Sequence, residues 1–297
     1  MTSHGTAQAR RGDLGLRMRW DILEALATYH LMTAELLMRA GVGRDLRRVR
    51  EAAWHLVRLD LIAFREKKFI QDEGTRSGLY WLRPKGVETL ATEGIEAHCS
   101  DRTLRTRNEV QHRLAIVETH IALRHWAATI DATVWAVQDF APDAPGRQKA
   151  TTVDLRCLAA GQKSTGTFIP DLLAKVTPPD GITRLLVFEI ERGGENGDLS
   201  EFRRWKLPKL RKVIASDELA DVLGVENRAR FLVVFKDARC REKALAKWPA
   251  PVLALWDDVY VKALDELAGE FGGGWWQPGG RRRCHLIEGV GLGFAAG

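Results

Sequence analysis

The sequence has few cysteines, and they lie far apart. The four positions, Cys99, Cys157, Cys240 and Cys284, form no paired spacing. Neither a zinc knuckle nor a disulfide framework is therefore expected. A protein of the reducing cytoplasm is the simplest interpretation.

Long apolar runs are missing as well. No stretch approaches the roughly 20 apolar residues that a helix needs to cross a bilayer. Residues 1–11 are polar and lack the apolar core of a signal peptide. We therefore expect no contact with a membrane.

Several motifs with known chemistry are absent. The eight histidines include no His-x-His pair, so a histidine-held metal site of that type is excluded. Only three tyrosines exist, Tyr29, Tyr80 and Tyr260, and packing explains each of them better than nucleophilic catalysis does. No Gly-x-x-x-x-Gly-Lys-Ser/Thr stretch is present to cradle nucleotide phosphates. A nucleotide hydrolase is not supported.

The composition that remains is typical of folded protein. The chain has 297 residues, of which 45% are hydrophobic and 28% charged, which leaves room for two domains of ordinary size. The net charge of +6 permits a polyanionic partner. We expect a flexible N-terminus over 1–15, a first domain over 16–96, a second over 97–270 and a loose tail, rich in Gly and Arg, over 271–297.

The first domain has the pattern of three helices followed by a hairpin. Apolar residues recur at helical spacing from Trp20 to Ala27, and Thr33 and Asp45 are suited to cap the second and third helices. Strands are predicted over 61–70 and 78–82, before a helix that begins at Pro84. This order predicts a winged helix-turn-helix, in which the third helix enters the major groove of duplex DNA.

Basic residues gather on the third helix and on the predicted wing. On a helical projection Leu46, Val49 and Ala53 fall on one face, whereas arginines fall on another. The residues expected to contact DNA are Arg44, Arg47, Arg48, Arg50, Arg58, Arg65, Lys67 and Lys68. The alternative is a solvated helix face without a partner, but a second basic cluster on the wing favours DNA.

The second domain alternates between extended and helical patterns, which predicts α/β structure (α+β overall) with a mixed sheet. A long helix is expected over 108–129. Strands are expected over 133–140, 152–158, 168–176, 183–191, 230–236 and 251–256, and helices over 199–215, 239–247 and 258–268.

Three acids stand in two of these apolar strands. Alternation places Glu189 and Glu191 on the same side of one strand, and Asp171 belongs to the strand before it. If these strands are neighbours, the three carboxylates converge and can hold Mg²⁺ or Mn²⁺. The other interpretation is that the acids pair with arginines such as Arg184 or Arg192.

The acids resemble the PD-(D/E)xK nuclease core, in which a Pro-Asp strand is followed by an acid, one residue and usually a lysine. Here Pro170-Asp171 fits, but Glu191 stands where the lysine is usual. A cation is then needed from the following helix, from Lys206 or Lys209.

The chain as a whole resembles the plasmid replication-relaxation family. The resemblance rests on the winged helix, on residues 112–115, on Trp135, on Pro170-Asp171 and on residues 189–195. It implies action at an origin of transfer or replication and, in catalytic members, metal-dependent nicking. Asp171, Glu189 and Glu191 would hold the metal and, with Lys206, form the catalytic set, with Glu118 as a candidate fourth acid. Double-stranded DNA is the implied partner, with a homodimer or other mobilisation and replication proteins left open.

Two other functions stay open from the sequence. One is a DNA-binding regulator or accessory factor whose second domain is catalytically silent, which Glu191 in the lysine position favours. The other is an interaction scaffold that does not bind DNA. The basic helix and wing argue against the scaffold.

Overall fold

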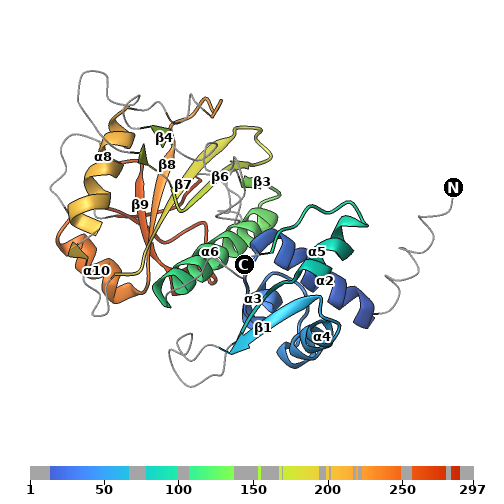
Figure 1. The fold of residues 1–297 in the computed structure, drawn as a ribbon. Coiled ribbons are helices and arrows are strands. Elements are labelled where there is room, and N and C mark those ends of the chain that lie inside the picture. The colour runs from blue at the N-terminus through green and yellow to red at the C-terminus, as the bar shows by residue number, and fades with distance from the viewer. Residues whose placement is uncertain are drawn as a thin grey trace, which may run out of the picture. The chain divides into compact units, whose positions relative to one another are not determined.

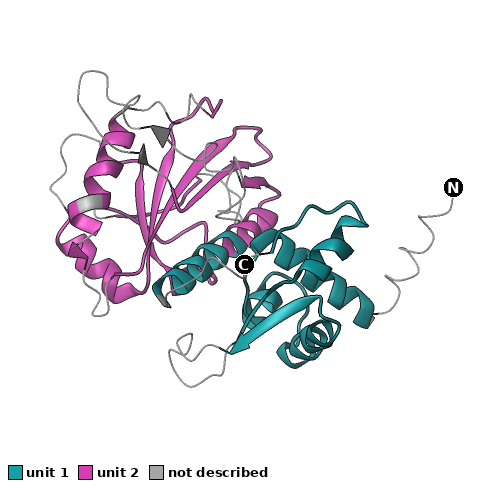
Figure 2. Cartoon of the chain, in the orientation of Figure 1, with its two compact units in different colours: residues 1–121, 139–144 teal, residues 122–138, 145–297 magenta. Residues whose placement is uncertain are grey.

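The computed structural model of the chain describes residues 14–66, 78–99, 107–136, 153–154, 167–168, 170–193, 199–200, 202–216, 219, 223–248, 256–278 and 282–287. The chain divides into two compact units, and the main division falls between Ile121 and Ala122 (Figure 2). The described part of unit 1 ends at Ile121, and unit 2 holds the described residues after it. The fold is mixed α/β, as predicted.

The described part of unit 1 begins with three helices, α2 (Leu14–Tyr29), α3 (Ala34–Arg39) and α4 (Leu46–Arg58) (Figure 1). The Thr33 hydroxyl accepts a hydrogen bond from the Leu36 amide at 3.2 Å, and Asp45 Oδ1 accepts one from the Arg47 amide at 2.8 Å. These side chains satisfy amides that a helix start leaves without partners. Both predicted caps are confirmed.

A hairpin and a short helix follow. Strand β1 (Ile62–Glu66) pairs antiparallel with β2 (Gly78–Leu82), and α5 (Pro84–Ala91) begins with proline as predicted. Leu82, Leu90 and Ile62 are buried. Residues 67–77, which include Lys67 and Lys68, lie outside the described residues.

The long helix α6 (Arg107–Thr129) contributes to both units. Val110 packs with Leu31 and Leu79, and the Tyr29 hydroxyl lies 3.1 Å from Nδ1 of His120. These contacts explain why unit 1 extends past the boundary expected at residue 96.

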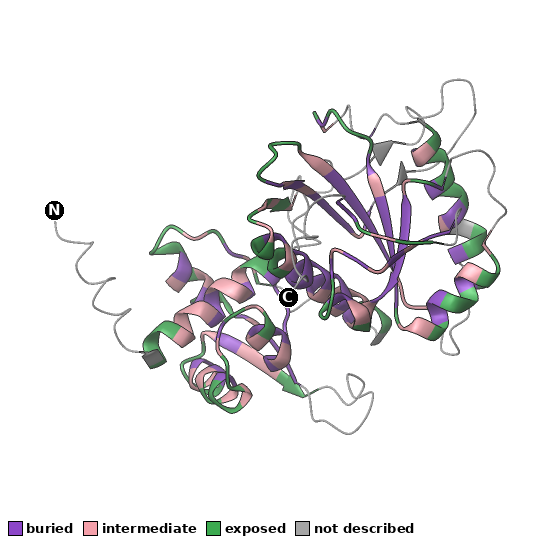
Figure 3. Cartoon of the chain, turned by 180° about the vertical axis from the view of Figure 1, so that it is seen from behind, coloured by how far each residue is buried: buried purple, intermediate pink, exposed green. Residues whose placement is uncertain are grey.

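Unit 2 contains a seven-stranded mixed sheet with the strand order β11-β10-β9-β8-β7-β6-β3. The central pairs β7 with β8 and β8 with β9 are parallel, and the others are antiparallel. The central strands are buried (Figure 3). The strands and the helices between them are β3 (Thr133–Ala136), β6 (Leu172–Thr177), β7 (Arg184–Glu191), the π-helical turn η1 (Phe202–Lys206), α8 (Leu207–Ser216), β8 (Arg230–Phe235), α10 (Ala238–Ala246), β9 (Val259–Ala263), α11 (Leu264–Leu267), β10 (Trp275–Gln277) and β11 (Arg282–Cys284). A separate pair joins β4 (Val153–Asp154) to β5 (Thr167–Phe168).

The two faces of this sheet have different neighbours. Leu185 and Val187 of β7 belong to the same apolar cluster as Leu210 of α8 and Ala244 of α10. Phe188, which points to the other face by alternation, lies against Phe271. The acid positions of β7 therefore share the face that packs against α8 and α10.

The helix predicted over 258–268 is wrong for most of its length. Val259–Ala263 is the buried strand β9, and only Leu264–Leu267 is helical. A short apolar run that is buried on both sides cannot be told from a buried helix by its periodicity. Of the strand predicted over 251–256, only Trp256 is described, and it lies in a turn.

The loose tail predicted over 271–297 is also wrong for its described part. Strands β10 and β11 extend the sheet antiparallel to β9, and Trp275 is fully buried. Burial of a large indole is strongly favourable, so the Gly-rich segment before it serves as a tight connection.

Candidate functional site

Three carboxylates and one ammonium group meet beside the sheet of unit 2. Nζ of Lys206 lies 3.6 Å from Oδ2 of Asp171, 3.2 Å from Oε2 of Glu189 and 3.7 Å from Oε2 of Glu191. The structure thus brings together all four residues that the sequence singles out for catalysis.

Neighbouring elements hold these side chains in place. Asp171 directly precedes β6, where its amide donates to the Phe188 carbonyl and its Oδ2 accepts from the Ile190 amide at 2.7 Å. The Asp171 carboxylate is therefore fixed beside β7, and Glu189 and Glu191 lie on one side of that strand, as alternation predicts.

Lys206 is the last residue of η1, at the point where α8 begins. The sequence left Lys206 and Lys209 as alternatives. Lys209 is exposed on α8, whereas Lys206 reaches the acids.

The electrostatics of the cluster follow from burial and charge. Desolvation raises the pKa of Glu189, and the charges of Asp171 and Glu191 raise it further, against the opposing effect of Lys206, to about 8. Burial lowers the pKa of the Lys206 ammonium, but the three carboxylates outweigh this, so its pKa lies above the ordinary value. Lys206 is therefore a fixed positive charge among the acids.

The donor set has the chemistry of a divalent-cation site. Carboxylate oxygens are the ligands that Mg²⁺ and Mn²⁺ prefer, and three acids are within reach of one point. Within the described residues, however, no group of three or more His, Cys, Asp or Glu side chains has the arrangement of a metal centre. The acids are centred on the Lys206 ammonium, so a cation would have to share this position with Lys206 or displace it.

Unit 1 exposes most of the basic residues predicted to contact DNA. Val49, Ala53 and Leu56 of α4 are buried, which leaves the opposite face of the helix toward solvent. Trp54 is exposed on that face, and its ring lies at a tilt against Phe64 of β1, with 4.9 Å between the ring centroids. The exposed members of the predicted set are Arg44, Arg47, Arg48, Arg58 and Arg65.

Two expected residues have protein partners instead. Arg50 Nη2 lies 2.7 Å from Oε1 of Glu35, so this pair ties α4 to α3. Glu118, the candidate fourth acid, forms an ion pair with Arg39 within unit 1. Neither contact was visible in the sequence, because each joins residues that are far apart in the chain or on different helices.

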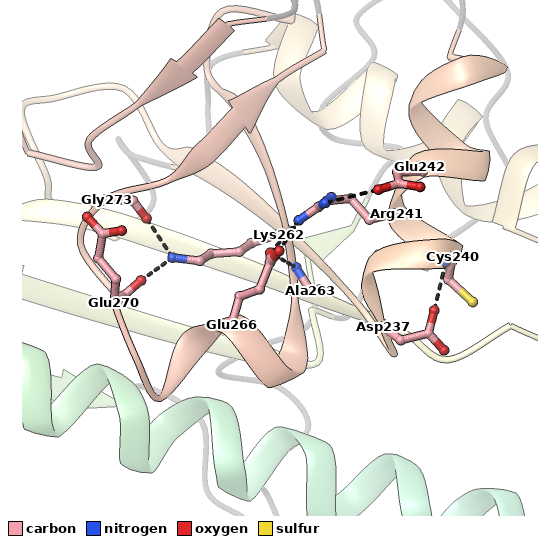
Figure 4. Close-up of polar contacts among 9 residues, drawn as sticks. All are labelled: Asp237, Cys240, Arg241, Glu242, Lys262, Ala263, Glu266, Glu270 and Gly273. Atoms are coloured by element: carbon pink, nitrogen blue, oxygen red, sulfur yellow. Dashed lines mark hydrogen bonds and ion pairs between the residues drawn. The ribbon is translucent and has the colours of Figure 1, made fainter.

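A second group of charged residues lies at β9, α10 and α11, and no motif in the sequence predicted it. Lys262 donates to the carbonyls of Glu270 and Gly273, and Arg241 pairs with Glu266 (Figure 4). The backbone carbonyls that surround the Lys262 ammonium connect β9 to the turn before β10. Its role is therefore structural, and the one signal in the sequence is a lysine inside an apolar run.

Comparison of the chain with protein-family models, with curated proteins and with solved structures finds no match in any of the three. In the part of the chain that the structure describes, no helix combines the length and apolarity that crossing a membrane requires.

Proposed function

We propose that the protein binds duplex DNA through unit 1 and nicks or relaxes it with a divalent cation held in unit 2, as a plasmid or mobile-element protein acting at an origin of transfer or replication. The observation that carries the proposal is the meeting of Asp171, Glu189 and Glu191 around Nζ of Lys206. Surface ion pairs rarely place three acids around one cation, and such convergence of titratable groups is typical of functional sites.

Each residue of the cluster has a role in this proposal. Asp171, Glu189 and Glu191 supply oxygen ligands, and a bound Mg²⁺ or Mn²⁺ would polarise the phosphodiester and lower the pKa of a bound water. Lys206 places a positive charge where the phosphate gains negative charge. The lysine thus compensates for Glu191 in the usual lysine position.

Unit 1 supports the DNA-binding half of the proposal. Its order of three helices, an antiparallel hairpin and a closing helix agrees with the order expected of a winged helix, which supports the proposal. Arg47, Arg48 and Arg58 project from α4 into solvent, and Arg65 does so from β1. Exposed arginines at these positions are suited to phosphate contacts that release counterions.

A specific observation also favours the catalytically silent accessory factor. The Lys206 ammonium already lies within 3.7 Å of all three acids and neutralises the charge that a metal ion would otherwise neutralise. In that case the cluster stabilises the fold and the protein acts by binding DNA alone.

The test for cutting uses supercoiled plasmid that carries the native origin region, incubated with the full chain and Mg²⁺, Mn²⁺ or EDTA. We expect relaxation that needs metal and is lost in Asp171→Asn and Glu189→Gln. Glu242→Gln, an exposed acid on α10, is the matched control and should relax the plasmid normally. Duplex binding without relaxation in either metal would support the silent accessory factor.

The test for binding compares duplex affinity over a range of salt concentrations. We expect Arg47→Ala combined with Arg58→Ala to weaken binding and to reduce the salt slope by roughly 0.9 for each phosphate that the variant no longer neutralises. Arg228→Ala, an exposed arginine in unit 2, is the control. An unchanged affinity in the double variant would exclude this face of α4 as the DNA interface.

A further inference from the structure

We propose that Trp135 and Lys175 form a stacking platform for an unpaired nucleobase, so that the substrate of unit 2 is melted or single-stranded DNA. The inference rests on the proposed function of unit 2. It adds a substrate class and two contact residues that lie apart from the carboxylate cluster.

Trp135 is unusual among the tryptophans of this unit. Its side chain is 58% exposed, whereas Trp256 and Trp275 are 3% and 0% exposed. Large aromatic side chains are normally buried to a high degree. Trp135 lies on β3, which is an edge strand of the seven-stranded sheet that the described residues form.

Lys175 is held next to this indole. The two residues are paired directly across β3 and β6, and Nζ of Lys175 lies 5.1 Å from the centroid of the Trp135 ring. The same ammonium donates to the Leu223 carbonyl at 2.6 Å. An ammonium has three donors, and in the described part of the chain the Leu223 carbonyl takes one of them, which leaves donors for a nucleic-acid phosphate beside the stacked base.

The platform faces the same side of the sheet as the carboxylates. Lys175 is paired with Leu185 of β7, and Leu185 shares its side of that strand with Glu189 and Glu191 by alternation. Asp171 precedes Lys175 by four residues, which is about 13 Å along a strand. The acids and Trp135 are therefore separated by a distance that a few nucleotides of a DNA strand can span.

The chemistry of stacking selects an unpaired base. With Lys175 over one side of the indole, the exposed remainder of the ring offers a surface on which a base can stack. Bases inside a duplex already stack on their neighbours, and proteins that contact them in this way act on single strands or extrude the base. Stacking of this kind tolerates any base, so the platform adds affinity for the strand without reading its sequence.

The test measures the binding of the full chain to fluorescein-labelled dT15 in EDTA, where no cutting occurs, and to a labelled 20-base-pair duplex. A stacked base contributes about 1–3 kcal/mol, so Trp135→Ala should weaken dT15 binding by about 5- to 150-fold. Trp135→Phe, which keeps an aromatic ring, should retain most of the affinity. Ile182→Ala, which removes another exposed apolar side chain of unit 2, should leave dT15 binding unchanged.

The outcomes separate this inference from the proposed function. Loss of dT15 binding in Trp135→Ala but not in Trp135→Phe supports the platform, even if the wild-type protein fails to bind the duplex and the proposal for unit 1 is lost. Absence of dT15 binding in the wild-type protein, equal dT15 affinity in Trp135→Ala, or a full loss that Trp135→Phe shares overturns it. Circular dichroism of each variant confirms that the fold is intact.

Discussion

Of the three carboxylates, Glu189 lies nearest to Lys206, with 3.2 Å between Nζ and Oε2. Glu189 is almost fully buried, whereas Lys206 is 39% exposed. The acid is thus fixed by the sheet, and the lysine at the start of α8 is the member that can exchange its place with another cation.

Replacing Lys206 with methionine should make this exchange measurable. The variant leaves three acids facing one another, and we expect a loss of about 1–3 kcal/mol in the free energy of unfolding, after allowance for the exposure of the ammonium. Millimolar Mn²⁺ should restore much of the loss, because a ligand that binds the folded state stabilises it. Urea unfolding with and without Mn²⁺ tests both effects. Lys209→Met serves as the control, and equal unfolding curves for the two variants would contradict the prediction.

The pair of Arg50 and Glu35 predicts a role in stability that is separate from DNA binding. Because the guanidinium is partly buried against α3, we expect Arg50→Ala to cost about 0.5–1 kcal/mol of folding stability and to change duplex affinity less than Arg47→Ala does. A double-mutant cycle with Glu35→Ala gives the coupling energy. A coupling energy near zero between Arg50 and Glu35, together with a strong loss of DNA affinity in Arg50→Ala, would show that Arg50 contacts DNA as the sequence predicted.

Lys262 predicts a dependence of stability on pH. Desolvation lowers the pKa of its ammonium from 10.5 to about 8, with Arg241 and Arg283 acting in the same direction and Glu270 and Glu266 opposing it. Between these two pH values the unfolded lysine holds a proton that the folded lysine has lost. The free energy of unfolding should therefore rise as pH increases from about 8 to 10.5, and this gain is lost as pH falls through 8.

Lys262→Met tests this dependence by urea unfolding at several pH values. The variant should lose the rise above pH 8, whereas Lys247→Met, an exposed lysine at the end of α10, should keep it. Parallel pH profiles for Lys262→Met and the wild-type protein would show that the ammonium stays charged in the folded state.

Because Gly86 of α5 lies close to neighbouring backbone, we expect a larger residue at this position to destabilise the fold. A Cβ at this position would come within 2.1 Å of the Leu61 carbonyl oxygen, which is backbone and cannot swing away. Alanine normally stabilises a helix relative to glycine by about 1 kcal/mol. We expect Gly86→Ala instead to lower the free energy of unfolding by roughly 1–3 kcal/mol, and this opposite sign identifies the steric contact as the cause. Thermal unfolding measures it, with Gly269→Ala as control, since its Cβ would meet nothing closer than 3.9 Å.

Sequence patterns predicted those features of the fold that depend on residues near one another in the chain. Thr33 and Asp45 cap helices because their side chains accept from amides two or three residues away. Strand alternation predicted that Glu189 and Glu191 share a side, and the neighbouring strand brought Asp171 to them. The mixed α/β class followed from the alternation of extended and helical segments.

Contacts between residues far apart in the chain could not be predicted from these local patterns. Nothing near Arg50 indicates that Glu35 lies opposite, and nothing near Lys206 decides between it and Lys209, because the π-helical turn η1 sets where α8 begins. β9 was mistaken for a helix because all five of its residues are buried, and a continuous buried run lacks the alternation that identifies a strand.

The strand order of the large sheet bears on how the chain folds as it is made. Read from β3 to β11, each strand in the sheet comes later in the sequence than the one before it. During synthesis each new strand can therefore add to an edge that already exists, without waiting for a partner that is still to come. Such sequential pairing joins segments that are close in sequence, which favours rapid folding, and unit 1 can complete its own core before the sheet begins to grow.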